Sequence, residues 1–330
     1  MIKNLKYLLY IVGGTLVGLG LFVLTDLLVQ LLQASGGDML EERRNTVHSR
    51  ESSGQQVKTM KRQRGPRIWT TLTKNWVPGT AVSKKDDFPG YNDPIPSKGT
   101  IRGRRSKSKT SVGSALAISP NGVWLTAKHV VEDCKDLVIQ AGLKNGKPAN
   151  LKPIKITTHR NADVAVITSP RTDYNREPFL LAARGDKAGD AFHIGFPRGK
   201  PGAVHSRFLG RMNIRRSNVR NSRERVLVWA EATRIPNFSG ILGGISGGAV
   251  VDRTGALIGI NSAASARRGR IMTSRPDTLA DVIGQSGYQP KKAPDIRPVI
   301  HELSAKRYPA YARAAIQDRR VIRVICRRRS

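Results

Sequence analysis

Short apolar runs separated by turn residues dominate the chain from about residue 109 onward. Residues 111–118 are apolar with a two-residue alternation, and Ser119-Pro-Asn-Gly122 after them is a strong turn signal. Residues 123–126 follow as a second short strand, so the two runs predict a β-hairpin. Further strands are predicted at residues 137–140, 154–157, 164–167, 191–194, 225–230, 249–251 and 256–260. Because little amphipathic helix separates these runs, they favour an all-β sandwich or barrel over a parallel α/β sheet.

The segments on either side of this region have a different composition. Residues 35–108 scatter Arg and Lys among Gly, Pro and Ser, which predicts a basic flexible linker that can add an N-terminal strand to the domain. Residues 278–283 predict a helix that closes the domain, and residues 309–323 predict a second helix that begins with a proline. We therefore expect a folded domain over residues 109–285 and a basic C-terminal tail over residues 286–330.

The N-terminal segment is the most apolar part of the chain. The apolar run over residues 7–25 approaches the ~20 residues that span a bilayer. We expect residues 1–34 to form an uncleaved transmembrane anchor, while Ala34-Ser35-Gly36 leaves open a cleaved signal peptide. Two lysines precede the run, so the positive-inside rule predicts a single-pass protein of the inner (plasma) membrane with its domain on the periplasmic side. Arg43 and Arg44 oppose that orientation.

The charge of the chain points to anionic partners. Lys and Arg number 57 against 24 Asp and Glu, which gives a formal net charge of +33. Such an excess favours attraction to an anionic surface, with residues 102–109 and 319–329 as candidate basic arms. No nucleic-acid-binding motif accompanies the charge, so specific nucleic-acid binding is not expected.

Cysteine and histidine usage argues against disulfide and metal chemistry. The two cysteines, Cys134 and Cys326, are far apart in sequence. Their pairing stays open in an oxidising compartment, but we expect them to be unpaired. The six histidines are scattered without ligand spacing, so no metal site is predicted.

Three polar residues stand in distinctive local sequences. His129 follows a predicted strand, Asp163 opens another, and Ser246 lies in a glycine-rich turn. Each alone has an ordinary structural explanation. Together they supply a nucleophile, a base and a carboxylate that orients the base. The glycines around Ser246 also allow backbone N–H groups to converge on an oxyanion.

These motifs resemble a known protease family. The chain order His, Asp, Ser is that of trypsin and chymotrypsin. The sequences of the motifs are similar to those of the bacterial HtrA/Deg branch. The motifs that carry the resemblance are residues 113–122, 125–131, 162–166, 193–197 and 244–252. The resemblance covers roughly residues 109–275. It implies a chymotrypsin-like fold of two six-stranded antiparallel β-barrels and a serine endopeptidase that needs no cofactor.

The resemblance also implies a role for each matching residue. Ser246 would be the nucleophile, His129 the general base and then acid, and Asp163 the orienting carboxylate. The backbone N–H groups of Gly244 and Ser246 would form the oxyanion hole. The residues implied to contact a protein or peptide substrate are Gly240, Ile241, Asn261, Ser262 and Ala263. No acid lies at positions 240 and 241, so a small or medium apolar residue is expected before the scissile bond.

The chain departs from the family pattern at two places. Ile245 replaces the Asn or Asp that precedes the serine, so activation by a freed N-terminus is not expected. Residues 240–243 replace the usual Asn-Pro-Gly, and the tail is too short for a PDZ domain. Two alternatives to an active protease remain: a protease-fold scaffold that binds peptides without cutting them, and an adaptor that binds anionic surfaces.

Overall fold

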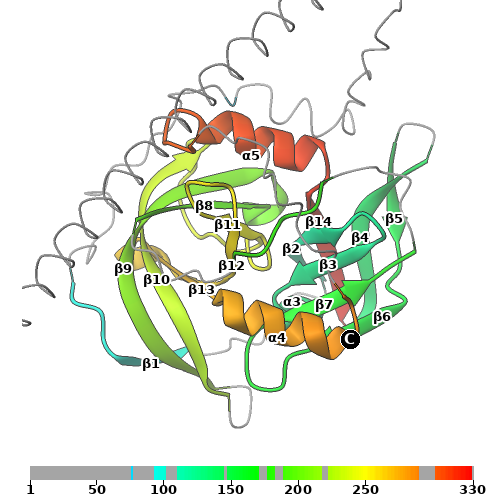
Figure 1. The fold of residues 1–330 in the computed structure, drawn as a ribbon, viewed down its shortest axis with the longest axis horizontal. Helices are drawn as coiled ribbons and strands as arrows, with labels where there is room; N and C mark the ends of the chain where they lie inside the picture. The colour runs from blue at the N-terminus through cyan, green and yellow to red at the C-terminus, as the bar shows by residue number, and fades with distance from the viewer. Residues whose placement is uncertain are drawn as a thin grey trace, which may run out of the picture. The chain divides into compact units, whose positions relative to one another are not determined.

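Strands make up most of the fold and form two sheets (Figure 1). The structure is a computed structural model that describes residues 76, 93–101, 110–144, 147–170, 177–182, 189–217, 222–289 and 302–328. Among the helices of these residues, none has the length and apolar character needed to cross a bilayer. The predicted anchor over residues 1–34 and the predicted basic arm over residues 102–109 lie outside the described residues.

The first sheet contains seven antiparallel strands. In chain order they are β2 (Thr110–Ser119), β3 (Val123–Thr126), β4 (Cys134–Lys144), β5 (Lys147–Leu151), β6 (Lys155–Thr158), β7 (Ala165–Thr168) and β14 (Val321–Arg328). Their order across the sheet is β5-β4-β14-β2-β3-β7-β6. The predicted hairpin is present as β2 and β3, which are buried over most of their length because the sheet packs its apolar residues into the core.

The second sheet closes into a barrel. Its strands are β1 (Lys98–Ile101), β8 (Asp190–Gly195), β9 (Gly202–Arg216), β10 (Glu224–Ile235), β11 (Ala249–Val251), β12 (Leu257–Ser265) and β13 (Arg270–Thr273). The order is β1-β9-β10-β13-β12-β11-β8, and β8 also pairs with β9, which closes the ring. The short strand β1 lies outside this ring and pairs with β9 in parallel. It lies in the segment over residues 35–108, which the sequence predicts as a linker that can add an N-terminal strand.

The prediction of two six-stranded barrels therefore holds for one barrel only. The second sheet contains a closed six-stranded barrel, whereas the first is open, because β5 and β6 at its two ends do not pair with each other. The sheets are also not purely antiparallel, since β1 runs parallel to β9. The chymotrypsin-like architecture of one closed barrel and one half-barrel is what the strands form.

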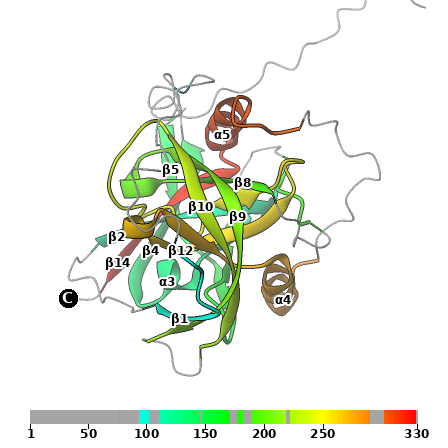
Figure 2. The ribbon, with the colours of Figure 1, turned by 90° about the vertical axis from the view of Figure 1, so that its left-hand side faces the viewer.

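Few helices accompany the sheets in the described part of the chain. They are α3 (Lys128–Val131), α4 (Pro276–Ser286) and α5 (Tyr308–Gln317), with single 3₁₀ turns η2 (Pro197–Gly199) and η3 (Ala266–Arg268). A proline occupies the first turn of both α4 and α5, where its missing N–H costs no helical hydrogen bond. Figure 2 shows α4 and α5 on the outside of the strands, where their apolar faces join the core.

The last described strand corrects the prediction of a basic tail after residue 285. β14 lies between β2 and β4 in the middle of the first sheet, so the fold extends to residue 328. The predicted helix over 309–323 ends as α5 at Gln317. Arginines of this segment are used within the fold, since Arg319 is buried and the Arg320 guanidinium lies 4.1 Å from the centre of the Phe179 ring. This second predicted arm is therefore part of the domain.

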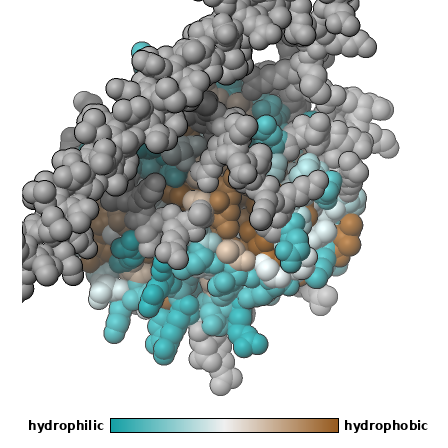
Figure 3. All heavy atoms as spheres, in the orientation of Figure 1, coloured by the Kyte–Doolittle hydropathy of each residue, from teal (hydrophilic) through white to brown (hydrophobic). Residues whose placement is uncertain are grey.

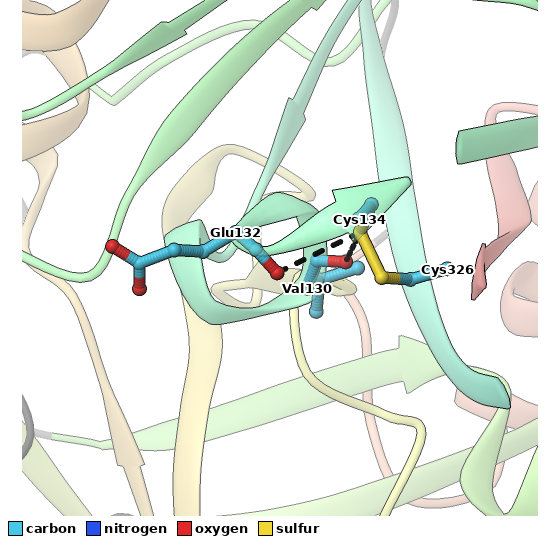
Figure 4. The surroundings of a disulfide bond; sticks show 4 residues. All are labelled: Val130, Glu132, Cys134 and Cys326. Atoms are coloured by element: carbon cyan, nitrogen blue, oxygen red, sulfur yellow. Dashed lines mark hydrogen bonds between the residues drawn. A yellow bond between two sulfur atoms is a disulfide. The ribbon is translucent and has the colours of Figure 1, made fainter. Parts of the chain in front are cut away.

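The two cysteines form a disulfide, contrary to the expectation that they are unpaired (Figure 4). Because β14 runs beside β4, the Cα atoms of Cys134 and Cys326 lie 5.3 Å apart despite 192 residues between them. The Cys134 sulfur also lies 3.6 Å from the carbonyl oxygen of Val130, which belongs to α3. The bond thus ties the C-terminal strand to the segment that follows α3.

Candidate active site

His129 lies in α3, the single helical turn directly after β3. Its backbone N–H donates to Asp163 Oδ1 (3.0 Å), and its ring Nδ1 lies 2.7 Å from Asp163 Oδ2. A carboxylate that is ionised can only accept, so Nδ1 carries the proton and donates it to Oδ2. This bond leaves Nε2 as the nitrogen that can act as a base. The imidazole is 37% exposed, whereas the Asp163 side chain is 2% exposed.

Asp163 lies in the turn before β7, and its buried carboxylate accepts several hydrogen bonds. Besides His129, the Ser262 hydroxyl donates to Oδ2 at 3.0 Å, and Arg216 Nη2 lies 2.7 Å from the same oxygen. Arg216 also donates to the Ser262 hydroxyl. The carboxylate is therefore held by groups from three different segments, which fixes the plane in which it meets the imidazole.

The pKa of Asp163 is lowered despite its burial. Burial alone would raise this pKa, because it removes water from the charged form. The charge and hydrogen bonds of His129, together with the charge of Arg216, outweigh that effect. Asp163 is consequently ionised at neutral pH, as a group that stabilises an imidazolium has to be.

Two further charged residues, which the sequence analysis missed, stand behind Asp163. Glu224 Oε2 accepts the backbone N–H of Asp163 at 3.1 Å, and Arg216 pairs with the carboxylate itself. Burial raises the pKa of Glu224 to about 7, with the nearby Asp163 charge adding to the rise. Arg216 ends β9 and Glu224 begins β10. No motif marks them in the sequence, because both residues lie in a long charged hairpin that is distant along the chain from the segments of His129 and Asp163.

Ser246 lies in a loop whose glycines adopt conformations that other residues avoid. Gly244 has a φ of +99° and Gly247 a φ of +81°. The Gly247 N–H donates to the Asn261 carbonyl (2.7 Å), and the Ser114 N–H donates to the Ser246 carbonyl (2.8 Å). These bonds connect the serine loop to both sheets. In the described part of the chain no hydrogen bond joins Ser246 to His129, and such bonds often tighten only when substrate is present.

Residues 113–260 match the family model of the trypsin-like peptidase domain. This part of the chain is a trypsin-like peptidase domain. The match begins in β2 and ends in β12, so it includes His129, Asp163 and Ser246.

Comparison of the peptidase domain with solved structures gave matches to other proteases. The Rv3671c protease from M. tuberculosis in its active form is 16% identical, covers 60% of this chain and 94% of its own, and has a TM-score of 0.43. The inactive form of Rv3671c is 19% identical, with coverages of 54% and 88% and a TM-score of 0.42. The HtrA-type protease AlgW with decapeptide is 25% identical, with coverages of 53% and 50% and a TM-score of 0.40, so the chain spans about half of AlgW. No curated protein matched the sequence.

Ile245, which departs from the family pattern, is part of the core of the peptidase domain. Its side chain is 3% exposed and belongs to an apolar cluster that also contains Leu242, Val250 and Trp229. Burial of an isoleucine here stabilises the serine loop by roughly 1.5–3 kcal/mol. The loop is thus attached to the barrel by apolar packing, in place of the polar contact that an Asn or Asp would make.

The backbone donors proposed for the oxyanion hole are not used elsewhere. Within the described residues, the N–H groups of Gly244 and Ser246 donate to no protein acceptor. A Cβ at Gly244 would come within 2.4 Å of the Phe196 carbonyl oxygen, so only glycine fits the position. Both N–H groups remain available to an oxyanion.

The five predicted substrate residues fall into two groups. Gly240 and Ile241 are exposed, and Arg234 Nη1 donates to the Gly240 carbonyl (2.7 Å). Asn261 and Ser262 are buried, with Asn261 bonded to His193 and Ser262 to Asp163, so their side chains brace the site and do not face a cleft. Ala263 is half-buried. No described strand pairs with β12 from Ser262 onward on the side opposite β13, which leaves backbone groups there for an extended peptide.

The described residues do not gather a metal site. In the part of the chain that the structure describes, no group of three or more His, Cys, Asp or Glu side chains could hold a metal ion.

Replacing Gly247 by Ala should lower the free energy of unfolding by about 2 kcal/mol. A Cβ at this position would lie 2.2 Å from the Ser114 carbonyl oxygen, and the residue needs a positive φ. Gly284→Ala in α4 is the matched control, because a Cβ there meets nothing within 4 Å. We expect the control to be neutral or stabilising when urea unfolding is measured. Equal losses in both variants would show that the serine loop is not conformationally restricted.

Proposed function

We propose that the chain is a serine endopeptidase that cleaves peptide bonds through an acyl-enzyme intermediate. The observation that carries the proposal is the bond between the buried Asp163 carboxylate and the half-exposed His129 ring, in a trypsin-like peptidase domain that also holds the Ser246 loop. His129 Nε2 takes the proton of the Ser246 hydroxyl as the oxygen attacks the scissile carbonyl. His129 then gives that proton to the leaving amine. In the second half of the reaction His129 takes a proton from water, which attacks the acyl carbonyl, and returns a proton to the Ser246 oxygen as the acyl group leaves.

The backbone of the serine loop supports the charged intermediate in this proposal. The N–H groups of Gly244 and Ser246 would donate to the oxyanion, which in other proteases is worth about 10²–10³ in rate for each donor. The substrate would lie extended along β12 beyond Asn261, with its first side chain directed toward Gly240 and Ile241. The cation Arg234 holds the Gly240 carbonyl, and this supports an apolar residue over Lys or Arg before the scissile bond.

The proposal extends to location. The apolar run over residues 7–25, with lysines before it, supports a membrane anchor and a peptidase domain on the extracytoplasmic side. Protease accessibility of the domain in spheroplasts tests this part. Digestion of the domain in intact spheroplasts supports the external side, and protection until lysis would place the domain inside.

The experiment that tests catalysis is labelling of the purified chain with a fluorophosphonate probe. Wild type should react and Ser246→Ala should not, because the probe modifies only an activated serine hydroxyl. Ser262→Ala is a useful comparison, since it keeps Ser246 and removes one donor to Asp163. A folded wild-type chain that fails to label would contradict the endopeptidase and favour a scaffold that binds peptides without cutting them.

A further inference from the structure

Four cations occupy one outer face where β1, β9 and β10 lie side by side. In the strand register, Lys98 pairs with Asn213, which pairs with Arg225. The next row on the same face places Thr100 beside Arg215, and Arg223 precedes Glu224 on the third strand. Side chains two residues apart in a strand point the same way, and all of these cations are exposed. We call Lys98, Arg215, Arg223 and Arg225 the β1 cationic face.

Among the described residues, no acid forms an ion pair with the β1 cationic face. Some exposed cations elsewhere in the described chain pair with acids, as Arg253 does with Glu302 and Arg327 with Asp136. None of the four cations of this face forms such a pair with a described residue. All four line a hollow of about 780 Å³, which Glu224 also lines although its carboxylate is bonded to the Asp163 N–H. The lower margin of Figure 3, where β1 lies in Figure 1, is correspondingly hydrophilic.

The neighbouring edge of β1 offers unpaired backbone groups. The Ser97 carbonyl accepts the Asn213 N–H and the Ile101 carbonyl accepts the Ser217 N–H, so odd-numbered positions face β9. Backbone groups alternate in direction along a strand, and those of Lys98 and Thr100 therefore point away from β9. No described strand lies on that side, because β1 is the outermost strand of its sheet (Figure 2). An open strand edge is a template for another strand.

We propose that this edge and the β1 cationic face bind an extended, acidic segment of polypeptide. The segment adds as a strand to β1 and directs every second side chain to the side of the sheet that carries the cations, with Lys98 on the adjacent strand and Arg215 on the next. Acidic residues at alternate positions repeat every ~7 Å, which matches the spacing of the two rows of the face. A polypeptide is favoured over other polyanions because only a peptide backbone can satisfy the N–H and C=O groups of Lys98 and Thr100.

The position of the face gives the bound segment a role in substrate choice, which rests on the proposed endopeptidase function. The strands β9 and β10 also hold Arg216 and Glu224, which contact Asp163. A substrate with an acidic stretch would be held on the peptidase domain by this face in addition to the active site, which raises its local concentration. The proposal thus predicts a preference for acidic polypeptides that the cleft residues alone do not provide.

Binding to the full-length chain carrying Ser246→Ala tests the proposal independently of catalysis. The probe is a fluorescent peptide of alternating Glu and Thr, and a peptide of alternating Gln and Thr is its neutral counterpart. The acidic peptide should bind, and Arg215→Ala with Arg223→Ala should weaken it about tenfold at low salt. Lys135→Ala with Lys306→Ala removes two exposed cations from elsewhere and should leave the affinity unchanged. Equal effects of the two double variants would overturn the proposal.

A second variant distinguishes strand addition from simple charge attraction. Thr100→Pro removes one outward N–H, keeps every charge and is tolerated on an edge strand. It should weaken the acidic peptide about fivefold and leave binding of an oligothymidylate unchanged. An unchanged peptide affinity, with the melting temperature also unchanged, would show that the face binds polyanions in general and would overturn the polypeptide assignment. Absence of peptidase activity would not affect any of these measurements.

Discussion

Asp163→Asn should lower kcat for peptide hydrolysis by about 10⁴-fold while the chain stays folded. In the wild type Asp163 Oδ2 accepts from His129 Nδ1 at 2.7 Å, which fixes the tautomer with a free Nε2. An asparagine can present its NH₂ group to Nδ1, and this favours the tautomer whose Nε2 already carries a proton. The imidazolium would also lose its counter-charge. Steady-state kinetics on a peptide substrate checks the result.

The control for Asp163→Asn has to separate catalysis from the loss of an ion pair. Asp136→Asn removes a half-buried carboxylate that pairs with Lys152 and Arg327 away from the proposed active site, and its kcat should stay at the wild-type value. Arg216, which pairs with Asp163, is left without its partner in the first variant. Adding Arg216→Leu should recover stability and leave kcat low. Recovery of kcat by that second change would contradict the tautomer explanation.

Glu224→Gln should stabilise the chain relative to wild type by about 3 kcal/mol at pH 8 and much less at pH 5. Burial raises the pKa of Glu224 from 4.5 to about 7, with the charge of Asp163 adding to the rise. Between pH 4.5 and about pH 7 the Glu224 carboxyl keeps its proton in the folded state but has released it in the unfolded state. Wild-type stability therefore falls as the pH rises through this range. Above pH 7 the difference is constant. A glutamine cannot ionise, and its carbonyl can still accept the Asp163 N–H.

The measurement is the free energy of unfolding in urea at pH 5 and pH 8 for both chains. Asp163 does not interfere, because its pKa lies below 3.8 and its contribution is lost only in stronger acid. Glu302→Gln, at an exposed ion pair with Arg253, is the matched control and should show no such dependence. A difference between wild type and Glu224→Gln that is the same at both pH values would contradict the raised pKa of Glu224.

The sequence predicted the parts of the fold whose signals are local. Strands β3 and β11 begin and end where the predicted apolar runs do. A short buried strand bounded by turn residues can be recognised from the local sequence alone. The structure brings His129 and Asp163 together as their order in the chain suggested, and it places Ser246 in a restricted glycine turn. Their catalytic roles stay a prediction until activity is measured.

The remaining features depend on contacts that no local pattern displays. The basic composition from Lys291 onward predicts a tail where β14 lies, yet Arg323 donates to Gln140 and to the Gly199 carbonyl across the fold. The disulfide was not expected because Cys326 approaches Cys134 only once β14 has paired with β4. Arg216 and Glu224 gain their importance solely from lying behind Asp163. Long-range pairing decided each of these cases.

The central place of β14 has a consequence for biosynthesis. The sheet whose strands flank His129 and Asp163 lacks an interior strand until residues 321–328 have left the ribosome, since β2 and β4 pair with β14 and not with each other. A nascent chain would hold these two strands with open edges and its histidine turn unsupported while the whole closed barrel is already made. The order of translation therefore delays assembly of the proposed catalytic residues, so the proposed peptidase activity would arise only after residues 321–328 have been made.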